Sequence, residues 1–149
     1  MKFNTKNGVF HLIGIKNVEK FEDYPVVIPK AVDEFRGRFE MQKDTVRSIV
    51  YEPKKGPSHD VGFFYCGALL EDKPTELPDG ISYLRLEGHY AYARDTFDVT
   101  RMGEFYNNLD NWILQNKLER KDFTEELMFE LYYPKEDGTM DLEVYMRIK

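Results

Sequence analysis

The order of predicted elements repeats on the two sides of residues 71–80, EDKPTELPDG, a polar segment with two prolines that is typical of a connector. Each side predicts a strand, a helix and two further strands, although residue identity between the sides is negligible. Two β-α-β-β units can cover each other's open sheet face around a pseudo-twofold axis. The chain is therefore predicted to be α+β, with pseudo-repeats over about 1–72 and 78–149 and a ligand cleft at their junction.

In the first half, β-branched and aromatic residues predict a strand over 9–15. Apolar residues at helical spacing predict a helix over 28–41, which Pro25 and Pro29 introduce. Gly37 weakens that helix by ~1 kcal/mol relative to alanine if it lies in the interior. Two further strands are expected over 45–51 and 61–70, the second of them dense in aromatic residues.

The second half predicts the same order of elements. A strand is expected over 81–93, and a helix over 99–117 carries its apolar residues on one face. A strand over 128–133 then meets the last strand, 142–148, through a hairpin loop at 135–139 that contains Asp-Gly. The last strand alternates apolar and polar residues, which indicates that one of its faces is buried.

The charge balance disfavours nucleic acid as a partner. The chain has 21 Lys and Arg against 27 Asp and Glu, a formal charge of −6. Contacts with phosphate backbones come mainly from clustered Lys and Arg, and no basic stripe is present in the sequence. The acidic excess lies in the second half, where it either keeps the surface solvated or attracts cationic ligands. We therefore expect no binding to nucleic acid.

Cysteine and histidine usage gives no sign of a metal site or cofactor. The single cysteine, Cys66, excludes an internal disulfide and a Cys-built metal site, and it is expected to be a small buried hydrophobic residue. The three histidines, His11, His59 and His89, lack metal-ligand spacing. The apolar run 9–15 is too short to span a membrane. The sequence thus predicts a cytoplasmic protein without membrane association, cofactor or metal.

Glu130 is the first candidate site residue because it interrupts an apolar strand. Alternation places Met128, Glu130 and Tyr132 on one face, and the other face is also apolar, so both faces are expected to be covered. A carboxylate buried there must be hydrogen-bonded, ion-paired or protonated. The residues alone leave two alternatives open, which are a structural pair with a nearby Arg or Tyr and a ligand contact.

Aromatic residues supply the other candidates. Trp112 belongs to the apolar face of its helix, and it fits either the core or a pocket wall. Tyr90 and Tyr92 share one strand face, as do Phe63 and Tyr65 on the corresponding strand of the first half. Each alone is typical of a core residue. Gathered from both halves, they could stack on a planar ligand or bind a cation, at about 0.5–2 kcal/mol per cation–π contact.

The second half contains a strand ending in Gly-x-Tyr-Ala, a helix with Trp near its end, and a strand bearing Glu-x-Tyr. The residues that match are Gly88, Tyr90, Ala91, Trp112, Glu130 and Tyr132. In this order and spacing they resemble the GyrI-like domain, the small-molecule effector-binding domain of multidrug-sensing transcription regulators. The resemblance is clearest over 78–149, and the first half fits more loosely.

The resemblance implies a duplicated β-α-β-β (SHS2-like) fold, with residues 1–149 as one effector-binding domain. It also implies that Glu130 lies at the floor of a drug pocket. The regulators carry a DNA-binding module before this domain. Because residue 1 already leads into the first strand, we expect this chain to correspond to the ligand-binding part alone.

The leading functional prediction is a binding protein for hydrophobic, cationic or aromatic small molecules, acting as a sensor or a sequestering protein. Its ligand-binding residues are predicted to be Glu130, Tyr132, Trp112, Tyr90, Tyr92, Phe63 and Tyr65. Some relatives in the family hydrolyse cyclopropane-bearing alkylating natural products, so a hydrolase is the second hypothesis. A protein–protein modulator, such as a gyrase-protecting protein, is the third, although nothing in the residues points to a protein partner.

Overall fold

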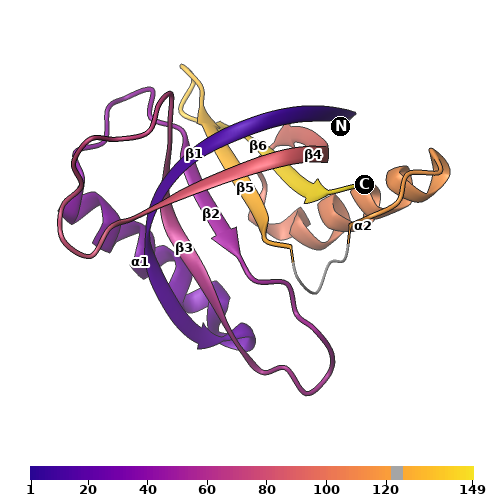
Figure 1. Cartoon of the computed structure of the whole chain (residues 1–149), viewed down its shortest axis with the longest axis horizontal. Helices are drawn as coiled ribbons and strands as arrows, with labels where there is room; N and C mark the ends of the chain where they lie inside the picture. The colour runs from indigo at the N-terminus through magenta and orange to yellow at the C-terminus, as the bar shows by residue number, and fades with distance from the viewer. Residues whose placement is uncertain (122–125) are drawn as a thin grey trace.

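The computed structural model describes residues 1–121 and 126–149 (Figure 1). The first unit consists of β1 (Lys2–Lys20), η1 (Phe21–Asp23), α1 (Tyr24–Arg38), β2 (Arg47–Tyr51) and β3 (Val61–Leu70). The second unit consists of β4 (Ser82–Thr96), η2 (Val99–Arg101), α2 (Met102–Gln115), β5 (Met128–Pro134) and β6 (Met140–Arg147). The two units thus repeat one order of strands and helices, as the sequence predicts.

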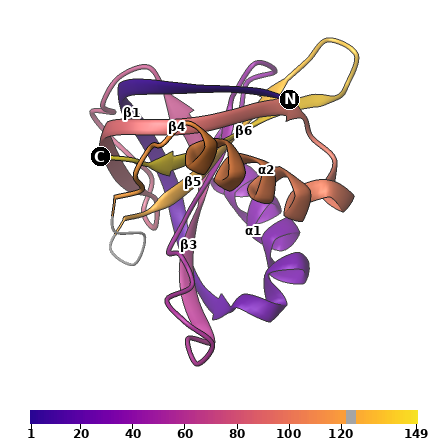
Figure 2. The ribbon, with the colours of Figure 1, turned by 90° about the vertical axis from the view of Figure 1, so that its right-hand side faces the viewer.

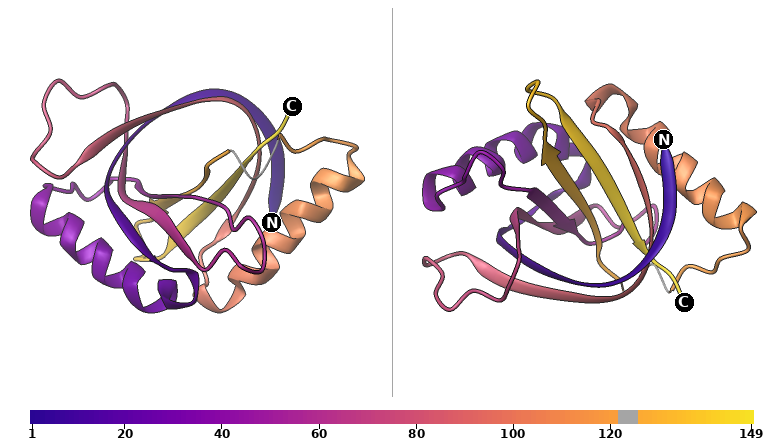
Figure 3. Two further views of the ribbon diagram at one scale, coloured as in Figure 1. Left: turned by 60° about the horizontal axis from the view of Figure 1, so that its bottom comes forward. Right: turned by 90° about the horizontal axis from the view of Figure 1, so that it is seen from above.

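The six strands form a closed antiparallel barrel in the order β1-β3-β2-β5-β6-β4. Within each unit the third strand lies between the other two, and the units join through the β1–β4 and β2–β5 pairs. The long, curved strands β1 and β4 run side by side in Figures 1 and 2. Both helices lie on the same side of the barrel, which leaves the opposite side to the strands (Figure 3).

The ends of several elements differ from the sequence prediction. β1 covers residues 2–20 instead of 9–15, because its first part pairs with β4 and its second part with β3. Helix α1 covers 24–38 instead of 28–41. Pro25 occupies its first turn, where the missing amide N–H would have no partner anyway, and the chain is already extended at Phe39. Pairing and capping therefore set these ends, and hydrophobic periodicity does not reveal them.

The sheet has two covered faces. One face packs against α1 and α2, and from α2 it receives Phe105, Leu109 and Ile113. The other face fills the interior of the barrel with aromatic rings, among which Phe129 and Tyr145 are stacked with centroids 4.6 Å apart. No helix in the described residues is long and apolar enough to cross a membrane.

Candidate functional site

Two cavities of about 570 and 630 Å³ lie between the helices and the sheet face that they cover. We call the cavity that reaches Tyr51 and Tyr106 the first compartment and the cavity that reaches Arg47 the second. Both cavities share the residues Tyr24, Ile28, Ile49, Met102 and Glu130. These shared residues come from both units, so the compartments meet at the junction where the sequence predicts a cleft. Each volume falls in the range of small-molecule sites, roughly 300–1,000 Å³.

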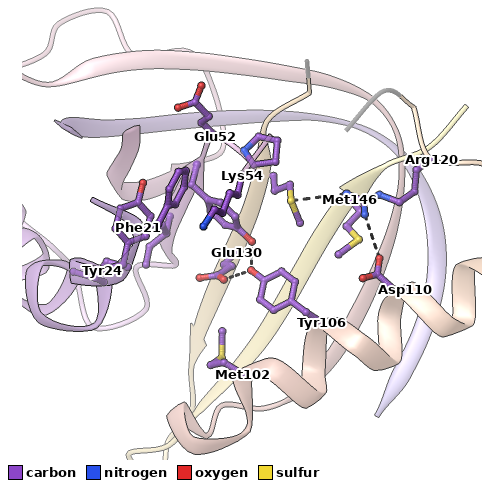
Figure 4. Close-up of a pocket in the computed structure, with 15 residues that line it drawn as sticks. Phe21, Tyr24, Glu52, Lys54, Met102, Tyr106, Asp110, Arg120, Glu130 and Met146 are labelled. Carbon is purple, nitrogen blue, oxygen red and sulfur yellow. Dashed lines mark hydrogen bonds and ion pairs between the residues drawn. The ribbon is translucent and has the colours of Figure 1, made fainter. Parts of the chain in front are cut away.

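Glu130 lies where the two compartments meet, in the middle of the sheet. It is paired with Ile49 of β2 on one side and with Val144 of β6 on the other, and only 7% of it is exposed. The Tyr132 hydroxyl donates to Oε1 at 2.6 Å, and the Tyr106 hydroxyl donates to Oε2. Figure 4 shows the Tyr106 hydroxyl directed at the carboxyl group. Both carboxyl oxygens are therefore hydrogen-bonded.

Among the described residues, the direct contacts of Glu130 are hydrogen-bond donors and include no ion pair. Burial raises its pKa above the ordinary value, and the hydrogen bonds from Tyr106 and Tyr132 oppose that rise. Burial also raises the pKa of both tyrosines well above 10, so they remain protonated donors at neutral pH. Within 1–121 and 126–149, no ion pair links Glu130 to a basic side chain. A cation entering the cavity would therefore meet a carboxyl group that has no ion pair within the described residues.

The remainder of the first compartment is mainly apolar, with charged residues among its lining. The Tyr51 hydroxyl shares a hydrogen bond with that of Tyr106, which extends the polar chain from Glu130. The thioether side chains of Met102, Met128 and Met146 line the cavity around these hydrogen-bonded groups. Methionine is flexible and adapts to ligands of different shape. The described charged lining residues are Glu52, Lys54, Asp110 and Arg120.

Tyr24 lines both compartments with an unused polar group. Its hydroxyl is buried and has no hydrogen-bond partner in the described parts of the chain. Burial raises the pKa of Tyr24 to about 12, so the group is a protonated donor at neutral pH. Buried polar groups are normally hydrogen-bonded. An acceptor group on a ligand, or a water molecule, would supply the partner that the Tyr24 hydroxyl lacks among the described residues.

Of the predicted site residues, Glu130 and Tyr132 line the compartments. Tyr90 and Tyr92 face the barrel interior instead, because the alternate positions Ala91 and Ala93 face the helices.

Phe63 and Tyr65 share a strand face in the same way, with Phe64 and Cys66 turned toward the helices. The rings of Phe63 and Tyr65 contact each other, with centroids 5.9 Å apart. These four aromatic residues lie apart from the two compartments, and our proposed site does not include them.

Trp112 lies outside both compartments as well. Its ring stacks on that of Phe3, with centroids 5.7 Å apart and 11° between the planes. Helix α2 instead turns Tyr106 toward Glu130. Tyr106 is not among the ligand-binding residues predicted from the sequence. Helical spacing puts Tyr106 and Trp112 on the same apolar face, so the sequence does indicate that Tyr106 is a candidate. Only the packing of the helix shows which of the two residues reaches the cavity.

Replacing Trp112 with alanine is expected to lower the free energy of unfolding by about 2 kcal/mol, less than for a fully buried tryptophan because the residue is half-buried. Ligand affinity should stay within about twofold, since Trp112 does not line the compartments. Urea unfolding and calorimetric titration measure the two effects. A large loss of affinity in a folded variant would place Trp112 in the site after all.

The comparisons with known proteins support the fold. No model of a protein family matches the sequence, and no curated protein is significantly similar to it. An integron cassette protein from the Vibrio cholerae mobile metagenome has 13% identity and a TM-score of 0.67, covering 99% of this chain and 95% of its own. The C-terminal domain of EcmrR has 13% identity and a TM-score of 0.65, with 99% and 97% covered. The chain has a GyrI-like fold.

A hydrolase from Listeria innocua also has this fold, with 7% identity, a TM-score of 0.60, and 99% and 92% of the two chains covered. The predicted α+β class with duplicated β-α-β-β units is confirmed. Because identities this low establish the fold alone, any ligand of this protein has to be argued from its own side chains.

Proposed function

We propose that this protein binds small hydrophobic molecules that carry a basic or aromatic group, in the two compartments that meet at Glu130. The observation that carries the proposal is the buried carboxyl group, which has two tyrosine donors and no cationic partner in the described residues. A buried charge is costly unless it is paired, so a cationic ligand group would stabilise the ionised form.

The walls support a ligand that is largely apolar. Methionines and aliphatic residues from both units line the compartments, and the few polar groups among them can fix the ligand's orientation. The hydroxyl of Tyr24, which has no hydrogen-bond partner among the residues that the structure describes, adds a donor at the junction. A protein that holds such molecules without altering them would act as a sensor or as a sequestering protein.

Thermal unfolding with a panel of ligands tests this proposal. Aromatic quaternary ammonium compounds and neutral aromatics of similar size are the probes. A ligand at a hundredfold excess over its Kd should stabilise the folded protein by about 2.7 kcal/mol. Ile28→Trp supplies the control, because Ile28 lines both compartments and a tryptophan there should fill their shared space.

Stabilisation of the wild type that is lost in Ile28→Trp supports the proposal. No stabilisation by any probe, or the same stabilisation in both proteins, contradicts it.

A hydrolase is the second candidate, favoured by the tyrosine-bonded carboxyl group beside a cavity. Burial raises the pKa of Glu130, as a general base requires, and the carboxylate could accept a proton from a water that attacks an electrophilic ligand. Mass spectrometry of an electrophilic probe after incubation separates the two functions. A product that carries one added water, absent with Glu130→Gln, indicates the hydrolase.

A further inference from the structure

The second compartment contains the guanidinium of Arg47, which forms no ion pair among the described residues. It lies opposite Tyr132 in the β2–β5 pair, its side chain is half-buried, and the Tyr132 ring centroid is 5.3 Å from the guanidinium carbon. Its Nη2 donates to the thioether sulfur of Met140 at 3.3 Å. In the described parts of the chain, no carboxylate lies within ion-pair distance of Arg47.

These two contacts do not replace an anion. Sulfur is a weak hydrogen-bond acceptor, and a cation–π contact contributes only about 0.5–2 kcal/mol. The guanidinium has five N–H donors in a planar fork that matches a carboxylate or sulfonate in bidentate fashion. Most of this hydrogen-bonding capacity of Arg47 is therefore unused.

A second guanidinium increases the positive potential in this compartment. Arg36 of α1 also lines it, and its only ion pair in the described residues is a long one, at 3.9 Å, to the exposed Asp33, which lines the compartment too. The pKa of Arg47 is lowered first by burial and next by the charge of Arg36, which shows that the two like charges influence each other. An anion bound near Arg47 would relieve both effects.

We propose that Arg47, with Arg36 beside it, forms an anion-binding subsite in the second compartment for a carboxylate, sulfonate or phosphate group on an otherwise apolar molecule. This inference rests on the proposed function, since it assigns part of the same ligand. Arg47 and Glu130 lie on one sheet face as diagonal neighbours of the β2–β5 pair, a spacing of about 7–8 Å. The two subsites together fit an amphoteric ligand whose basic and acidic groups are separated by a few bonds.

A pair of fluorescent probes tests the subsite. Anilinonaphthalene sulfonate and N-phenylnaphthylamine share one aromatic skeleton and differ in the sulfonate, and both brighten in apolar surroundings. Fluorescence titration gives the Kd of each probe for the wild type and for Arg47→Gln. We expect the substitution to weaken the sulfonate at least about tenfold and to leave the neutral probe within about twofold, since a charge-assisted hydrogen-bonded contact is lost for the sulfonate alone.

Two further variants serve as controls. Arg38→Gln removes the same charge from α1, but Arg38 is paired with Glu34 at 3.1 Å and lines neither compartment, so both affinities should stay unchanged. Ile28→Trp fills the shared space of the compartments and should weaken both probes. Urea unfolding confirms that each variant is folded. In the wild type, added salt should weaken the sulfonate and not the neutral probe.

The outcomes distinguish the two proposals. If the neutral probe binds and Ile28→Trp blocks it, but Arg47→Gln leaves the sulfonate unchanged or weakens both probes equally, the anion subsite is overturned and the binding function stands. If Ile28→Trp affects neither probe, binding in the compartments is overturned and the subsite with it. Should Arg47→Gln be unfolded, the salt dependence in the wild type decides, and a sulfonate affinity that does not change with salt overturns the subsite.

Discussion

Replacing Gly67 with alanine is expected to lower the free energy of unfolding by about 3 kcal/mol or more, enough to prevent folding of a marginally stable domain. Gly67 of β3 lies directly opposite Gly14 of β1. A Cβ at Gly67 would lie 1.7 Å from the carbonyl oxygen of Ile13 and 2.6 Å from the Cα of Gly14. Because both obstacles are backbone atoms, no side chain can rotate to relieve the overlap, and the β1–β3 pair would have to separate.

Gly37→Ala is the matched control for this substitution. Gly37 lies in α1, and a Cβ there meets nothing within 4 Å. Alanine should therefore stabilise the helix, by about 0.4–1 kcal/mol. Urea unfolding followed by circular dichroism measures both variants. A Gly67→Ala protein as stable as the wild type would show that the two strands are not in this close contact.

Glu130→Gln is expected to weaken cationic ligands by about 2–5 kcal/mol, more than tenfold in Kd, and to leave neutral aromatics nearly unchanged. Glutamine preserves the shape of the side chain and removes the negative charge that the buried cavity offers to a cation. Glu104→Gln on the exposed surface of α2 removes the same charge outside the compartments, and it should change neither class. Calorimetric titration with one cationic and one neutral ligand of similar shape measures the difference.

The affinity of a cation should also depend on pH in a defined direction. Burial raises the pKa of Glu130 in the free protein, whereas a bound cation favours the ionised form and lowers that pKa. At a pH below the raised value, the carboxyl group must therefore release a proton when the cation binds. Affinity should increase with pH up to the pKa of the free protein and then level off. In Glu130→Gln this increase should be absent.

Two results would contradict this account of the site. One is an equal loss of affinity for the cationic and the neutral ligand in Glu130→Gln, which would indicate a change of shape instead of charge. The other concerns a cationic ligand that does not itself titrate. If its affinity for the wild type does not change with pH, the predicted proton release from Glu130 does not occur. Either result would remove Glu130 as the counter-charge of the ligand.

Several features of the protein were determined by the local sequence. The connector at 71–80 and the repeated order of elements predicted the duplicated fold. Strand alternation put Glu130 and Tyr132 on one face, and the structure places both residues in the compartments. These features could be predicted because helical and strand periodicities are local, and each depends only on residues a few positions apart.

Tertiary structure alone decided which apolar face became the site. Periodicity shows that Tyr90 and Tyr92 share a face, but it cannot show that closure of the barrel turns that face inward. The contact of Tyr51 with Tyr106 joins residues 55 positions apart, and that of Tyr106 with Glu130 joins residues 24 positions apart. Such contacts follow from the pairing of β2 with β5 and from the docking of α2. Both are long-range events, governed by the burial of whole faces, and no local pattern encodes them.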